Sequence, residues 1–146
     1  MAKVLAVKDS KKKGAATSPP THIWWVCLQG RMHAREVFIE LPSADRIRLD
    51  RSMLSLLHGV TPPDSLFKLR KGKHGIFEFK SGKHRVLACY VDLLDATSGY
   101  VLLHTCQKAG GQNDDIRPED EQAAISRKEY CLKALAVENL VVHKKS

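Results

Sequence analysis

The sequence lacks the features that mark a membrane protein or a disulfide-bonded one. Its 146 residues contain no apolar run long enough to cross a bilayer, and the N-terminus alternates lysine with short apolar pairs where a signal peptide would have a continuous apolar segment. We therefore expect a soluble, cytoplasmic protein with no membrane partner.

Cysteine is scarce and scattered. The four cysteines have no C-x-x-C pairing and no histidine at zinc-finger spacing: Cys27, Cys89, Cys106 and Cys131. Such spacing argues against a structural metal site and against a disulfide framework. We expect reduced, buried thiols and no metal.

Acidic residues are the minority charge. Sixteen Asp and Glu stand against 24 Lys and Arg, which gives a formal net charge of +8 and a pI near 9.5. This excess favours a polyanionic partner, either a nucleic acid or an acidic protein, and does not choose between them.

The length predicts one domain with a sizeable core. Residues 1–20 are rich in lysine and poor in apolar side chains, so we predict a disordered basic tail followed by a domain over 21–142. Trp24 and Trp25 then need burial. The alternation over 35–41 predicts a strand with Val37 and either Ile39 or Phe38 facing inward.

A helix is predicted from Ser43, as N-cap, to about His58, with Gly59 just beyond it. The positions at helical spacing are Ile47, Asp50, Leu54 and Leu57, with Met53 beside them. A second helix is predicted from the Pro- and acid-rich segment 116–121 to about Val137. Val141 and Val142 either pair at a sheet edge or trail off.

The central stretch, residues 69–108, has the pattern of two hairpins. A basic loop precedes a strand over 76–80, which the pair Ser81–Gly82 separates from a second strand over 83–91; a third follows over 100–108. If Ser81–Gly82 is a two-residue turn, Glu78 lies opposite Arg85. Similar counting at the next turn pairs Arg85 with Lys108, so all three would form one row on one face.

Cations are concentrated here. Between Lys68 and Arg85 there are seven Lys and Arg and one acid, Glu78. Like charges opposite each other destabilise a sheet, so a pairing of Arg85 with Lys108 calls for compensation by Glu78 or by a bound anion such as RNA phosphate. The alternative is a solvated charged face with a cross-strand ion pair of small value.

Four segments of the sequence resemble the RelE/HigB toxin superfamily, most closely its phage-derived, HigB-like branch: Gly75–Lys80, His84–Leu87, Tyr100–Lys108 and Pro118–Arg127. The resemblance is strong over 66–130, weak over 35–59 and absent before Thr21. It implies an α+β, RelE/ParE-like fold: a twisted, mainly antiparallel sheet packed with N-terminal helical structure and a C-terminal helix.

The resemblance also implies a function. Such proteins are toxins of type II toxin–antitoxin pairs, partnered by a cognate antitoxin, and they cleave mRNA on the ribosome without metal or small-molecule cofactor. The ribose 2′-OH attacks the adjacent phosphate and leaves a 2′,3′-cyclic phosphate. This chemistry needs a base, cations for the phosphoryl charge and an acid for the leaving oxygen.

Carried over by position, Arg85 would stabilise the phosphate, and Lys108 would contact it or donate a proton. The base would come from the basic loop, which holds Lys71, Lys73 and His74. Glu78 would orient Arg85. The remaining residues with an expected RNA-binding or supporting role are Arg70, Lys80, Lys83 and His104.

Two departures from the family pattern keep alternatives open. Ala109 stands where the branch commonly has a second lysine, and 109–116 contain no counterpart of the tyrosine that assists several relatives. His104 or His143 would then be a candidate acid. The rival functions are a ParE-like toxin that poisons DNA gyrase and a catalytically decayed module of the same fold that binds RNA or protein.

Overall fold

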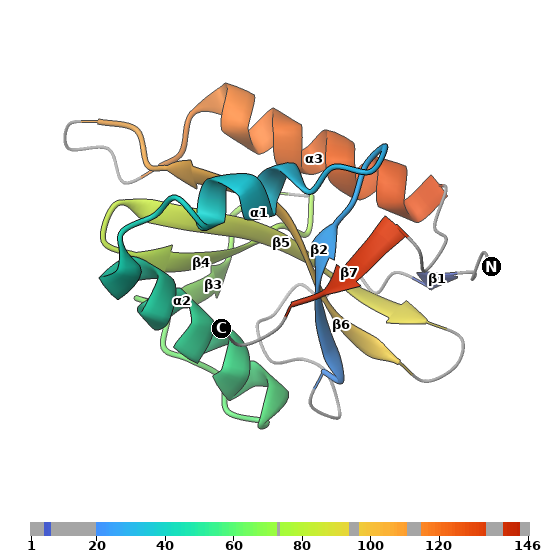
Figure 1. Ribbon diagram of the computed structural model, residues 1–146, viewed down its shortest axis with the longest axis horizontal. Coiled ribbons are helices and arrows are strands. Elements are labelled where there is room, and N and C mark those ends of the chain that lie inside the picture. The colour runs from blue at the N-terminus through green and yellow to red at the C-terminus, as the bar shows by residue number, and fades with distance from the viewer. Residues whose placement is uncertain are drawn as a thin grey trace.

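A mixed, mostly antiparallel sheet forms the centre of the α+β fold (Figure 1). The computed structural model describes residues 5–6, 20–72, 74–93, 97–110, 115–133 and 139–143. Its elements are β1 (Leu5–Ala6), β2 (His22–Val26), α1 (His33–Phe38), α2 (Ser43–Leu57), β3 (Phe67–Leu69), β4 (Phe77–Ser81), β5 (His84–Leu93), β6 (Ser98–Gln107), α3 (Pro118–Lys133) and β7 (Leu140–Val142).

The strand order is β3-β4-β5-β6-β2-β7, with the two-residue β1 beside β5. Among the strands of the described ranges, only β2 and β6 run parallel, and every other neighbouring pair is antiparallel. Gly99 lies opposite His22 in the parallel pair, and a Cβ on it would lie 1.8 Å from the His22 carbonyl oxygen. A glycine is therefore required where these two strands meet.

The sheet buries both faces, because β5 and β6 alternate between two cores. One core contains Trp25, the phenylalanines of β3 and β4, and side chains of α1 and α2. The other contains Trp24, the alternate residues of β5 and β6, and Ala124 and Cys131 of α3. The predicted burial of both tryptophans is confirmed, one on each face.

The segment predicted as a strand over 35–41 is instead α1 and the turn after it. Ala34 and Phe38, four residues apart, face the core, while Val37 and Ile39 are 46% and 45% exposed. The prediction of Phe38 as an inward residue is confirmed and that of Val37 and Ile39 is wrong. Three consecutive apolar residues fit a helix as well as a strand, and Ala34 extends the helical spacing.

α2 has almost the predicted bounds, and Gly59 beyond it has a φ of +82°. Its N-cap is Pro42, so Ser43 is the first helical residue and makes no cap bond. The buried face is Leu49, Ser52, Met53 and Leu56, whereas Ile47 is 51% exposed. The predicted stripe and the observed buried stripe both have helical spacing, and packing on the sheet buries the one that contains Leu49 and Leu56.

α3 begins at Pro118, as predicted. Its expected end near Val137 lies outside the described residues, as does most of the predicted disordered tail. Val141 and Val142 do pair at a sheet edge, opposite Trp25 and Trp24. Across the described ranges, every helix is too short or too polar to span a membrane.

Candidate functional site

The turn between β4 and β5 is Gly82–Lys83, one residue later than predicted. Ser81 faces His84, so Arg85 lies opposite Lys80 and not opposite Glu78. Gly82 has a φ of +56°, which suits the first central position of a two-residue hairpin turn. Gly82 occupies this first position, so the pairing register of β4 and β5 differs from the predicted one.

The β5–β6 register also differs from the prediction. Arg85 lies opposite Cys106, not Lys108, and a bulge interrupts the ladder at Leu87/Ala88. Both register errors move a partner by two residues along its strand. Because side chains alternate with a period of two, the predicted residues stay on one face although they are not directly opposite.

Glu78 and Arg85 form a buried ion pair on the α3 side of the sheet. Arg85 Nε lies 3.2 Å from Glu78 Oε1, and each side chain is 3% exposed. Arg85 Nη1 also donates to the carbonyl oxygens of Gly82 and His84, at 2.7 and 3.0 Å. The Arg85 guanidinium is therefore hydrogen-bonded to the backbone at the turn and is buried away from solvent.

Arg70 joins the same network from the β3–β4 loop. Its guanidinium donates to Glu78 Oε2 at 3.1 Å, to Asp115 Oδ1 at 2.7 Å and to Glu121 Oε2 at 3.2 Å. Burial would lower the Arg70 pKa, but the hydrogen bond with Asp115 and the charge of Glu78 more than offset it and raise that pKa. Three carboxylates therefore engage a residue that was expected to bind RNA.

The basic loop connects β3 to β4 and is fixed by α3. The Arg70 N–H donates to the Ile76 carbonyl oxygen at 2.8 Å, and the buried Lys128 Nζ donates to the His74 carbonyl oxygen. Lys71 and His74 are exposed, and Lys73 lies outside the described residues. Four residue steps of β4, about 13 Å, separate this loop from the Gly82–Lys83 turn.

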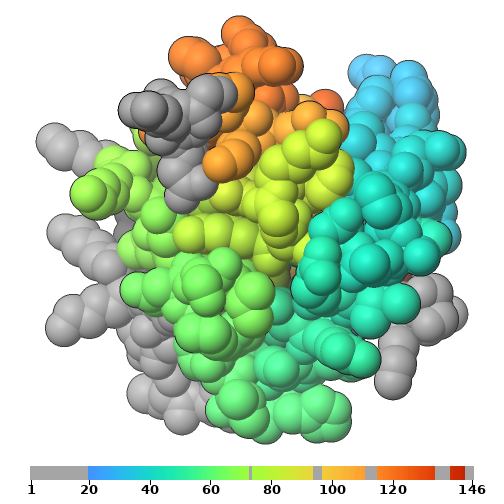
Figure 2. All heavy atoms as spheres, turned by 90° about the vertical axis from the view of Figure 1, so that its left-hand side faces the viewer, coloured from blue at the N-terminus to red at the C-terminus, as the bar shows by residue number. Residues whose placement is uncertain are grey.

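Three lysines gather at the turn end of the hairpin, and we call them the lysine cluster: Lys80, Lys83 and Lys108. Lys80 lies opposite Arg85, and the Lys108 N–H donates to the Lys83 carbonyl oxygen at 2.8 Å. Lys83 is exposed and the other two are half-buried. In Figure 2 the yellow-green hairpin reaches the surface between the start of α3 (orange) and α1 and α2 (teal).

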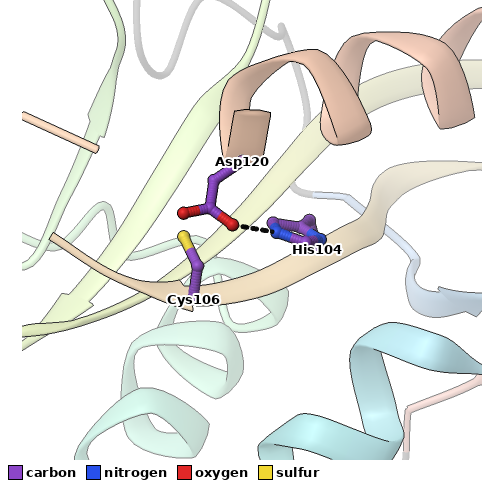
Figure 3. A group of neighbouring side chains, drawn as sticks. All are labelled: His104, Cys106 and Asp120. Carbon is purple, nitrogen blue, oxygen red and sulfur yellow. Dashed lines mark hydrogen bonds and ion pairs between the residues drawn. The ribbon is translucent and has the colours of Figure 1, made fainter. Parts of the chain in front are cut away.

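His104 lies between β6 and α3 with both ring nitrogens engaged (Figure 3). Its Nε2 lies 2.8 Å from Asp120 Oδ1, and Arg127 Nη1 lies 2.9 Å from its Nδ1. A guanidinium is always a donor, so Nδ1 accepts and Nε2 carries the proton toward Asp120. This arrangement clamps α3 to the sheet and leaves no nitrogen for a substrate proton.

Cys106 joins His104 and Asp120 in a group whose potential ligand atoms lie within 4.8 Å of one another (Figure 3). Two features make it a poor metal site. Burial, helped by the charge of Asp120, raises the Cys106 pKa to about 12, whereas a metal binds the thiolate. A metal on Nε2 would also move the imidazole proton to Nδ1, where it would face the Arg127 donor.

Sequence reasoning missed the side chains that hold this region together: Asp115, Asp120, Glu121, Arg127 and Lys128. The acids of 116–121 were interpreted only as a helix start, and Asp115 as part of a flexible loop. The available signal was the cation-rich stretch 68–85 earlier in the chain, because buried cations require partners. Lys128 carried no such signal in the sequence.

The comparisons with known proteins identify no relative: no protein-family model, no curated protein and no solved structure matches the chain. Its residues and their geometry are thus the basis for a functional proposal.

Proposed function

We propose that this protein is a RelE/HigB-like toxin that cleaves mRNA on the ribosome and is held inactive by a cognate antitoxin. The observation that carries the proposal is the lysine cluster at the end of the β4–β5 hairpin, with the Arg85 guanidinium beneath it. Three lysines whose backbone positions meet at one turn would form a local site for a polyanion.

The lysine cluster suits the charge requirements of the reaction. An ammonium group at this position would stabilise the negative charge that develops on the phosphoryl oxygens as the 2′-OH attacks. Another would donate a proton to the leaving 5′ oxygen. Arg85 would act indirectly, because its hydrogen bonds to the carbonyl oxygens of Gly82 and His84 fix the turn that carries Lys83.

The basic loop would act on a different part of the RNA. Lys71 and His74 are exposed in the loop before β4, and the strand that separates this loop from the turn is about 13 Å long. This separation fits contacts to a neighbouring nucleotide better than contacts to the reacting phosphate. The base for the 2′-OH is therefore sought first within the lysine cluster.

A second candidate function is RNA binding without cleavage. It is favoured by the burial of Arg85, which is 3% exposed, and by the engagement of both His104 nitrogens. A binding module keeps the lysine cluster and predicts salt-dependent RNA binding with no cleaved product.

The test uses the triple variant Lys80→Ala, Lys83→Ala, Lys108→Ala. A matched control removes three exposed cations elsewhere: Arg51→Ala, Arg117→Ala, Lys133→Ala. Induction of the wild-type protein in a bacterial host without antitoxin is expected to arrest growth and produce mRNA fragments with 2′,3′-cyclic phosphate ends. The cluster variant should abolish both effects and the control should retain them.

Each other outcome argues against part of the proposal. Growth arrest with cleaved DNA in gyrase complexes and intact mRNA would identify a gyrase poison. RNA binding without fragments, by folded protein on purified translating ribosomes, would favour the binding module. Full mRNA cleavage by the cluster variant would exclude the lysine cluster as the site.

A further inference from the structure

A cavity of about 400 Å³ lies between α1, α2 and β7, at the opposite edge of the sheet from the β3–β4 hairpin. Its lining residues are Trp25, Met32, Arg35, Phe38, Ile39, Arg46, Asp50, Val141, Val142 and His143. Trp25 and Phe38 are core residues with their rings 5.2 Å apart, whereas Ile39, Val141 and Val142 are exposed. The cavity therefore combines a rigid aromatic wall with an exposed aliphatic rim.

Two cations line the cavity without a carboxylate partner among the described residues. Arg46 Nε donates to the Leu41 carbonyl oxygen at 3.2 Å, and Arg35 makes no ion pair in that part of the chain. The acid of the cavity is Asp50, and His143 Nε2 lies 2.7 Å from its Oδ1. The free charge of the cavity is thus positive, which favours an acidic occupant.

His143 adds a buried polar atom that has no hydrogen-bond partner among the described residues. Its side chain is 8% exposed, and its Nδ1 is buried without a hydrogen-bond partner in the described structure. The Asp50 carboxylate fixes the Nε2 proton, so Nδ1 of the neutral ring is an acceptor. Such an unsatisfied buried group costs free energy, so the packing around His143 beside the cavity is not optimal in the protein alone.

The neighbouring strand has an open edge. The His143 N–H donates to the Ile23 carbonyl oxygen and the Cys27 N–H to the Asn139 carbonyl oxygen, both at 2.7 Å. In an antiparallel ladder the intervening residues point their peptide groups the other way. Leu140 and Val142 therefore direct theirs away from β2, and no strand of the described chain lies on that side of β7.

We propose that this edge and cavity form a docking site for an extended segment of a partner protein. The segment adds to β7 as a further strand, inserts a large apolar side chain against Trp25 and Phe38, and places a carboxylate between Arg35 and Arg46. Strand addition supplies main-chain hydrogen bonds, and the cavity supplies side-chain specificity. The inference does not depend on the proposed nuclease activity, because the lysine cluster lies on other strands.

A peptide segment fits these features better than other occupants. RNA offers phosphates to the arginines but no aliphatic side chain for the cavity and no peptide edge for β7. A small apolar anion would fill the cavity and leave the peptide groups of Leu140 and Val142 unused.

The test selects peptides from a random dodecapeptide phage-display library on the full-length protein. Enriched peptides are expected to share a large apolar residue with an acidic residue close by. Binding of a synthetic enriched peptide should slow amide hydrogen exchange at Leu140 and Val142, the readout specific to strand addition.

Matched variants locate the binding site. Ile39→Glu fills the cavity mouth with charge and should weaken the peptide by about tenfold or more, the size expected for loss of a buried anchor. Ile47→Glu is the control, because Ile47 is equally exposed and does not line the cavity. The pair Arg35→Gln, Arg46→Gln should likewise weaken it, while Arg51→Gln, Arg117→Gln should not.

Several results would overturn the proposal. These are the absence of enriched peptides, peptides whose affinity is unchanged by Ile39→Glu, and peptide binding with unchanged exchange at Leu140 and Val142. Binding of the apolar anion 8-anilinonaphthalene-1-sulfonate in the cavity without any peptide binding would indicate a small-molecule site. Self-association that Ile39→Glu abolishes would identify a second copy of the chain as the occupant.

Discussion

The two faces of the sheet are buried by different kinds of side chain. Under α1 and α2, the rings of Phe67, Phe77, Phe79 and Tyr100 pack with centroids 4.6 to 6.2 Å apart. Under α3, β4 and β5 bury Glu78 and Arg85, and α3 itself contributes the buried Lys128. Both faces therefore bury apolar side chains, but the α3 face also holds ions that stay buried only because each has a partner.

This contrast assigns stability mainly to the apolar contacts, and the positioning of the lysine cluster to the buried ions. An apolar face stabilises in proportion to the area it removes from water. A buried ion network contributes little net stability but fixes the geometry of the turn that carries the lysine cluster. The four predictions below test that division, from the largest expected effect to the smallest.

Removing a ring from the aromatic face is expected to have the largest effect. Phe79 is 0% exposed and packs on Phe67 at 4.6 Å, so Phe79→Ala should lower the free energy of unfolding by about 3–5 kcal/mol. Urea denaturation measures the loss. Val37→Ala, on the exposed side of α1, serves as the control and should change it by less than about 0.5 kcal/mol. Similar losses for the two variants would contradict the packing described for this face.

Breaking the ion network should cost slightly less. Glu78→Gln leaves the buried Arg85 without its carboxylate, and we expect a loss of about 3 kcal/mol in the free energy of unfolding. Glu129→Gln, at an exposed position of α3, is the control. Replacing the three most buried members of the network by Glu78→Leu, Arg70→Met and Arg85→Leu should recover most of that loss, because the remaining Asp115 and Glu121 are partly exposed. A triple variant less stable than Glu78→Gln would show that the ions themselves stabilise the fold.

The rim of the network should give a smaller, pH-dependent effect. The hydrogen bond from Arg70 holds the pKa of Asp115 below its ordinary value of 3.8. A lowered pKa contributes stability above 3.8 that is lost as the pH falls through the lowered pKa. Because the Asp115 side chain is 58% exposed, we expect Asp115→Asn to cost less than about 1 kcal/mol at neutral pH.

Denaturation at a series of pH values measures that difference. The gap between wild type and Asp115→Asn should shrink as the pH falls below 3.8. Glu119→Gln at the exposed start of α3 should show no comparable gap. A gap that stays constant down to the lowest pH would mean that the contact does not depend on the Asp115 charge.

The prediction with the smallest expected effect needs no substitution and concerns how tightly α3 covers its face of the sheet. Burial raises the pKa of Cys89, and it raises the pKa of Cys106 and Cys131 to about 12. These thiols should resist alkylation at mildly alkaline pH until the protein is unfolded. Mass spectrometry of the alkylated peptides measures this, with Cys27 as the internal reference expected to react first. Rapid native labelling of Cys131 would indicate that α3 opens readily.

Local patterns in the sequence were sufficient for much of this description. Turn residues and apolar alternation located β4, β5, β6 and α3, because these features act within a few residues. The sequence also predicted that Glu78 and Arg85 lie on the same face of the sheet. A register error of two residues does not change the face, because side chains alternate with a period of two. The exact partners were not predicted, because Gly82 and a bulge set the register.

Tertiary structure decided the rest. The segment 35–41 and the buried stripe of α2 each fit two alternatives locally, and only packing on the sheet chose between them. The same packing placed Asp120 and Arg127 on His104 and turned a candidate acid into a clamp. The sequence by itself determined where cations gather along the chain. Only the fold decided which of them are neutralised inside and which remain at the surface, because the pairing of Arg85 depends on strand register and two partners of Arg70, Asp115 and Glu121, lie far along the chain.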